Sequence, residues 1–107
     1  MKKSIYIAGA ISNDPDYVNK FSRAEKQLRD IFNGDVINPV RETKLAFDNP
    51  ESEKWETLML FCLKLLSSCT HIYLLPDYYK SAGACIELMW AQKLNLVIIR
   101  ESEKEVA

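Results

Sequence analysis

Hydrophobic and polar residues follow two patterns along this chain, short apolar runs and longer amphipathic stretches. The apolar runs at 4–8, 35–38, 71–75 and 96–99 are rich in β-branched and aromatic residues, and they predict four strands. In the stretches that begin at Tyr17, Trp55 and Ala82, apolar positions recur at steps of three and four residues. This spacing predicts three amphipathic helices, reaching about Phe32 and Cys69 in the first two cases.

Turn-forming residues separate these elements. Residues 9–16 have loop composition, and Gly34 is expected to end the first helix in the left-handed conformation. Pro39 is expected to stop the second strand, while the mixed polar segment 42–53 predicts a loop with possible helical turns. The third helix is expected to turn three apolar residues inward: Leu88, Met89 and Ala91.

The order of the predicted elements indicates the fold class. Strands that are apolar on both faces and alternate with helices are typical of a parallel sheet covered on both sides. We therefore predict an α/β fold, a flavodoxin- or Rossmann-like three-layer sandwich with a four- to five-stranded, mainly parallel sheet. Right-handed crossovers favour the strand order 2-1-3-4, and a ligand is expected beyond the carboxyl ends of the first and third strands. Residues 1–107 are expected to form a single domain.

Composition narrows the classes of function. The chain has 107 residues, 48% of them apolar and 27% charged, with a net charge of -1, which is the balance of a soluble domain. Nucleic-acid polymers are not expected as partners, because no basic stripe is present. A membrane span is not expected either, since no run of about 20 apolar residues occurs.

The cysteine and histidine content indicates the cellular compartment of the protein and whether it can hold a zinc ion. Three cysteines without paired spacing predict reduced thiols and a cytoplasmic location, and no signal peptide is recognisable at the start. Zinc sites need several His or Cys ligands at close spacing, whereas His71 is the only histidine. We therefore predict no structural or catalytic zinc.

Two loops at the predicted switch point each lead into a helix. A helix start favours anions such as phosphate, through its free N–H groups and its dipole. Gly83 would let the backbone approach a ligand, and Ser81 offers a hydroxyl group. A serine before a helix is also an ordinary N-cap, so both readings of Ser81 stay open.

Glu87 lies in the early turns of the third helix, between Ile86 and Leu88. It is either a solvent-facing residue favoured by the helix dipole or a carboxylate in the crevice, able to act on an anomeric carbon. Tyr6, near the end of the first strand, is either a core residue or a hydroxyl that holds this carboxylate. The spacing does not decide between these alternatives.

Taken together, the segments "IYIAG", "VINP" and "IYLLPDYYKSAGACIELMWAQKLNLVII" resemble the nucleoside 2-deoxyribosyltransferase superfamily, over almost the whole chain. The resemblance is strongest to its small branch of domain-of-unknown-function 4406. It implies cleavage or transfer at the N-glycosidic bond of 2′-deoxynucleosides or their 5′-monophosphates. Related chemistry, such as phosphoribohydrolysis or cleavage of a nicotinamide dinucleotide, would use the same glutamate.

The resemblance also implies roles for particular residues. Glu87 matches the family's glutamate nucleophile, and Tyr6 matches the tyrosine that orients it. Ser81 matches the serine that contacts phosphate in the deoxynucleoside 5′-monophosphate N-glycosidases. The remaining substrate contacts would come from three further residues: Gly9, Ser12 and Gly83. A homodimer or higher homo-oligomer is implied as well, and no metal or cofactor is implied.

One departure from the family pattern concerns the leaving base. Cys62 stands where the family carries an aspartate that helps to protonate the base. Because a thiol is a poor general acid, Asp77 or an acid of a neighbouring subunit would have to substitute. The alternative is a nucleotide-binding module of the same fold with weak or no catalysis.

Overall fold

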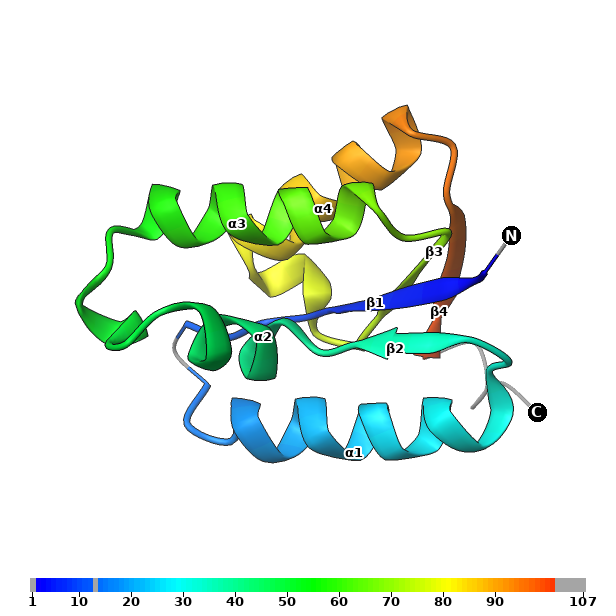
Figure 1. Ribbon diagram of the computed structural model, residues 1–107, viewed down its shortest axis with the longest axis horizontal. Coiled ribbons are helices and arrows are strands. Elements are labelled where there is room, and N and C mark those ends of the chain that lie inside the picture. The colour runs from blue at the N-terminus through cyan, green and yellow to red at the C-terminus, as the bar shows by residue number, and fades with distance from the viewer. Residues whose placement is uncertain (1, 13, 102–107) are drawn as a thin grey trace.

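The computed structural model describes residues 2–12 and 14–101. Their helices and strands follow one another along the chain (Figure 1) in this order: β1 (Ser4–Ala8), α1 (Tyr17–Ile31), β2 (Asp35–Ile37), α2 (Pro39–Ala46), α3 (Trp55–Ser67), β3 (His71–Leu74), α4 (Ala82–Lys93) and β4 (Val97–Arg100). Short 3-10 turns lie at Pro50–Ser52 (η1) and Tyr78–Lys80 (η2). The four strands and three long helices were predicted from the sequence pattern.

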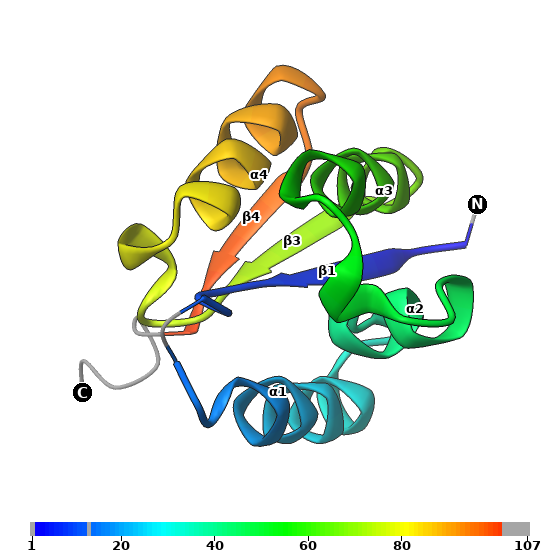
Figure 2. The ribbon, with the colours of Figure 1, turned by 90° about the vertical axis from the view of Figure 1, so that its left-hand side faces the viewer.

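The sheet has the predicted topology. Within the described residues its four strands lie in the order β2-β1-β3-β4, and all three pairings are parallel. The register places Tyr6 beside Ile37 on one side and Ile72 on the other. Because the strands are parallel, their carboxyl ends share one edge, which faces the viewer in Figure 2. The loops after β1 and β3 therefore meet there, as the switch-point rule predicts.

Helices cover both faces of the sheet, with α1 on one side and α3 and α4 on the other (Figures 1 and 2). Alternating strand residues supply the two cores. One core packs strand residues such as Ile5 and Ile7 against Phe21 and Leu28 of α1. The other contains Tyr6, Ala8, Ile72 and Leu74 from the strands, with Leu66, Ala84 and Ala91 from the helices. The three-layer α/β sandwich is thereby confirmed.

The segment after β2 corrects one expectation. Pro39 does not only end the strand but also opens helix α2, where a loop was predicted from residue 42 onward. Proline suits the first helical position, because its missing N–H needs no partner there. Asn38 completes the signal, since its side chain accepts a hydrogen bond from the Val40 N–H at 3.0 Å. This Asn-Pro pair was the local clue to the helix.

Gly34 also differs from its predicted role. Helix α1 ends at Ile31, its C-cap residue Phe32 is extended, and Gly34 does not have a positive φ. A Cβ atom at Gly34 would lie 2.3 Å from the Lys3 carbonyl oxygen, so the glycine is required by close packing of backbone. The positive φ found among the described non-glycine residues belongs to Asn95, at 61°.

Helix α4 is buried less than predicted. Ala91 is fully buried and Leu88 is partly buried, but Met89 is 64% exposed, contrary to the inward orientation expected for it. Residue 89 lies two positions from both Glu87 and Ala91, and a helix turns by about 200° over two residues, so it points away from the side that packs on the sheet. Among residues 2–12 and 14–101, no helix is both long and apolar enough to cross a membrane.

Candidate active site

Glu87 lies on the sheet-facing side of α4 and is only 7% exposed. Tyr6, fully buried on β1, donates a hydrogen bond from its hydroxyl group to Glu87 Oε2. Residues 81 positions apart in the chain therefore form a buried pair beside the carboxyl end of β1. Glu87 is therefore buried against Tyr6 and does not face solvent.

Burial changes the protonation of this pair. Loss of water raises the pKa of Glu87 from 4.5 to about 8, although the hydrogen bond from Tyr6 acts in the opposite direction. Burial and the nearby charge of Glu87 also raise the pKa of Tyr6 well above its usual value. Glu87 is therefore largely protonated at neutral pH.

Cys62 of α3 is the third member of this cluster. Burial and then the charge of Glu87 raise the pKa of the Cys62 thiol to about 11, while a hydrogen bond with Tyr6 lowers it. The side chains of Cys62, Tyr6 and Glu87 thus interact with one another, and we call them the buried trio. The thiol lies where the resemblance places an acid, and it keeps its proton at neutral pH.

The start of α4 is organised by Ser81. Its Oγ accepts a hydrogen bond from the Ala84 N–H at 3.1 Å, so Ser81 is an N-cap. A Cβ atom at Gly83 would lie 3.4 Å from Met59 Sδ, which is ordinary contact. Packing therefore does not require glycine at position 83. That Gly83 lets a ligand approach the backbone stays a prediction. The partly buried Ser81 remains available for a polar contact as well.

Gly9 has a packing reason of its own. A Cβ atom at this position would lie 2.6 Å from Leu75 Cδ1 and 3.0 Å from Leu75 Cβ, and Leu75 is buried in the core. The glycine therefore lets the end of β1 pack against the residue that follows β3. This contact brings together the two loops of the switch point.

The two loops are joined by an ion-pair cluster that the sequence did not reveal. Lys20 of α1 pairs with both Asp14 and Asp77, and its Nζ donates to the Ala10 carbonyl at 3.1 Å. Asp77 Oδ1 also accepts the Ala10 N–H at 3.3 Å. Both oxygens of Asp77 are thus in use within this cluster. Asp77, Ser12 and Lys80 line a pocket of about 370 Å³ at this edge.

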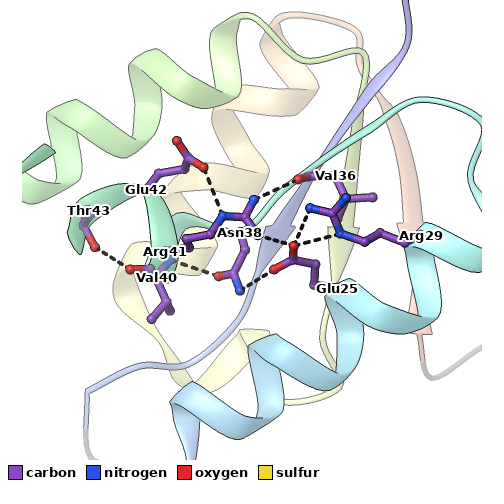
Figure 3. A network of polar contacts seen from close by, with 8 residues as sticks. All are labelled: Glu25, Arg29, Val36, Asn38, Val40, Arg41, Glu42 and Thr43. Carbon is purple, nitrogen blue, oxygen red and sulfur yellow. Dashed lines mark hydrogen bonds and ion pairs between the residues drawn. The ribbon is translucent and has the colours of Figure 1, made fainter. Parts of the chain in front are cut away.

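A second pocket, of about 290 Å³, opens beside Cys62 and is lined largely by apolar side chains from α2, α3 and the loop after β1. Its α2 wall is held by a polar network around Glu25 of α1 (Figure 3). Glu25 pairs with Arg29 and Arg41, and its Oε1 accepts a hydrogen bond from Asn38 Nδ2 at 3.1 Å. The network fixes α2 against α1, and with it Val40 on the pocket wall.

Four of the seven predicted site residues fall into two groups. Tyr6 and Glu87 lie together in the buried trio, with Cys62, whereas Ser12 and Asp77 lie at the ion-pair cluster. The pocket beside Cys62 was not foreseen, because its α2 wall was predicted to be a loop. Among the described residues, no group of three or more His, Cys, Asp or Glu side chains is placed to hold a metal ion.

Comparisons with known proteins agree with the α/β fold described above. The family model described as "Domain of unknown function (DUF4406)" matches residues 3–100. Among the solved structures, a 2-desoxiribosyltransferase from Leishmania mexicana is similar, with a TM-score of 0.65 and 20% sequence identity. The match covers 92% of this chain and 63% of that protein, so this chain spans less than two thirds of its length. No curated protein matches the sequence significantly.

Proposed function

Since the chain belongs to the family described as domain of unknown function DUF4406 and shares its fold with a 2-desoxiribosyltransferase, we propose that it is an enzyme of the N-glycosidic bond. Its substrates would be 2′-deoxynucleosides or their 5′-monophosphates. The observation that carries this proposal is the Tyr6–Glu87 pair, a buried carboxyl group held by a hydroxyl at the carboxyl edge of the sheet. A raised pKa on a carboxyl group in such a place is typical of functional sites.

The proposed reaction proceeds in two displacements. The ionised Glu87 carboxylate attacks C1′ of the sugar, the C1′–N bond breaks, and the base leaves with the bonding electron pair and takes up a proton. A second base or water then attacks C1′ of the glycosyl-enzyme and releases Glu87. Tyr6 orients the carboxylate oxygen Oε2 throughout. We further propose that Ser12, Asp77, Ser81 and Gly83 contact the sugar or its phosphate.

A second candidate function is binding of a nucleotide without turnover. The observation that favours it is Cys62, because its thiol keeps its proton up to a pKa of about 11 and is a poor donor to a leaving base. In this case the site around Glu87 would hold the nucleotide without cleaving it. We place either activity in the cytoplasm, where the three free cysteines stay reduced.

A chromatographic assay for free base decides between the two functions. The protein is incubated with each 2′-deoxynucleoside and each 5′-monophosphate, with and without an acceptor base. Base release is expected, and a requirement for the acceptor would identify a transferase rather than a hydrolase. Retention of an intact nucleotide with no release from any substrate would contradict the enzyme proposal and support the binding function.

We also propose that a second copy of the chain covers the outer face of α3 and α4. Both helices are apolar almost all round, which is typical of buried helices. Leu60 is 67% and Met89 64% exposed. Trp90 is also exposed, and its indole N–H donates a hydrogen bond to Ser67 Oγ at 2.8 Å, which joins the two helices. A self-complementary apolar face is what a two-fold dimer requires.

Sedimentation velocity tests this dimer. Leu60→Glu is expected to shift the protein from dimer to monomer, because it places a charge at the centre of the proposed interface. Leu45→Glu is the matched control, since Leu45 is also an exposed leucine but lies on α2. A monomeric wild-type protein, or equal effects of the two variants, would contradict the proposal.

A further inference from the structure

The pocket beside Cys62 has walls and a rim of different chemistry. The pocket is lined by Tyr17, Val40 and Leu58, and also by Cys62, which belongs to the buried trio. Its rim carries two charged residues from different elements, Lys44 of α2 and Glu51 of η1, and both are exposed. A largely apolar pocket with a few polar groups is typical of a small-molecule site.

The position of this pocket relates it to the reaction. Cys62 lines the pocket and also interacts with Tyr6 and Glu87, so this side chain connects the pocket with the proposed nucleophile. The volume of about 290 Å³ suits one ring system rather than a larger ligand. In a deoxynucleoside, the group next to C1′ with these properties is the base.

We propose that this pocket holds the base of the substrate and that Glu51 and Lys44 select guanine, an inference that rests on the proposed function. Guanine presents two adjacent donors, N1–H and the N2 amino group, beside the O6 acceptor. A carboxylate accepts two parallel N–H groups, and an ammonium group donates to a carbonyl oxygen. The pair Glu51 and Lys44 supplies one group of each kind.

The other bases fit this pair less well. Adenine has an amino donor next to a ring nitrogen acceptor, so one carboxylate oxygen would face a lone pair. Cytosine offers a single amino group to the carboxylate, and thymine offers one N–H between two carbonyl groups. A site that pairs with particular donors rejects ligands lacking them, because its own polar groups are then left without partners.

Glu51→Gln is the variant that tests the selection. It is expected to lower kcat/KM for the guanine substrate by roughly 10- to 100-fold, since a charge-assisted pair of hydrogen bonds is lost. The value for the adenine substrate is expected to change less than about threefold, which is smaller than the loss of a single such hydrogen bond. Glu53→Gln is the matched control, because Glu53 is exposed two residues further on and does not line the pocket. Thermal melting checks that the variants are folded.

Direct binding of the four free bases, measured by calorimetry, separates this inference from the proposed function. Guanine binding that is lost in Glu51→Gln, without turnover of any substrate, would overturn the function and keep the base pocket. Turnover with equal kcat/KM for all bases, or an equal effect of Glu51→Gln on each substrate, would overturn the guanine selection. Absence of both base binding and turnover would overturn both.

Discussion

Glu87→Gln is expected to abolish base release while the protein stays folded. The amide is close in size to the carboxyl group and still accepts the hydrogen bond from Tyr6, but it cannot attack C1′. Loss of a nucleophile typically lowers kcat by at least about 10³-fold. The assay is the chromatographic one, with kcat and KM determined separately for the best substrate.

The same variant is expected to change how stability depends on pH. The Glu87 carboxyl group ionises near 4.5 in the unfolded chain and near 8 in the folded protein. Between these values the unfolded state binds fewer protons, so the free energy of unfolding falls as pH rises and levels off above about pH 8. The total loss is on the order of 5 kcal/mol, at about 1.4 kcal/mol per pH unit over the roughly 3.5 units between the two pKa values. The Glu87→Gln variant lacks this ionisation, so its free energy of unfolding does not fall with pH for this reason.

Urea denaturation at several pH values between 4.5 and 9 measures this difference. The advantage of Glu87→Gln over the wild type is expected to grow with pH. Glu56→Gln serves as the control, because Glu56 is exposed in the first turn of α3. Parallel curves for wild type and Glu87→Gln would show that the buried carboxyl group does not titrate as inferred.

Catalysis should follow the same ionisation. If ionised Glu87 is the attacking group, kcat/KM rises with pH up to about 8, the pKa of Glu87. From pH 6 to pH 8 the ionised fraction, and hence kcat/KM, grows roughly 50-fold. A flat profile over this range would assign the nucleophile to another group.

Cys62→Asp is expected to accelerate base release by about 10²-fold, because it introduces a general acid next to the leaving base. The thiol of Cys62 holds its proton up to a pKa of about 11, so it contributes little as an acid. Two carboxyl groups in one buried site do not ionise together, and their pKa values separate. One of them then attacks C1′ while the other carries the proton for the base.

Cys62→Asn provides the matched control for this prediction, because Asn has the shape of Asp without a transferable proton. Both variants are expected to lower the free energy of unfolding, since each buries a polar group where a thiol lies. The informative quantity is therefore the ratio of their kcat values at equal folded fraction. A ratio near one would show that protonation of the base does not limit the reaction.

The sequence by itself determined the layout of the fold. Apolar runs mark strands and steps of three and four mark helices, and both patterns are local, so the four strands, the three long helices and the order β2-β1-β3-β4 could be predicted. Local patterns were weaker where one residue serves two purposes. Pro39 ends a strand and opens α2, and the second role was missed.

Only the tertiary structure decided the chemistry of the site. Whether Glu87 faces solvent or Tyr6 depends on how α4 packs on the sheet, and that packing joins residues 81 positions apart. The pKa of Glu87 follows from the water that this packing excludes, and no spacing in the sequence encodes it. The same holds for Lys20, which gathers Asp14 and Asp77, and for the pocket beside Cys62. Periodicity is a property of neighbours in the chain, whereas burial and charge proximity arise from contacts between distant segments.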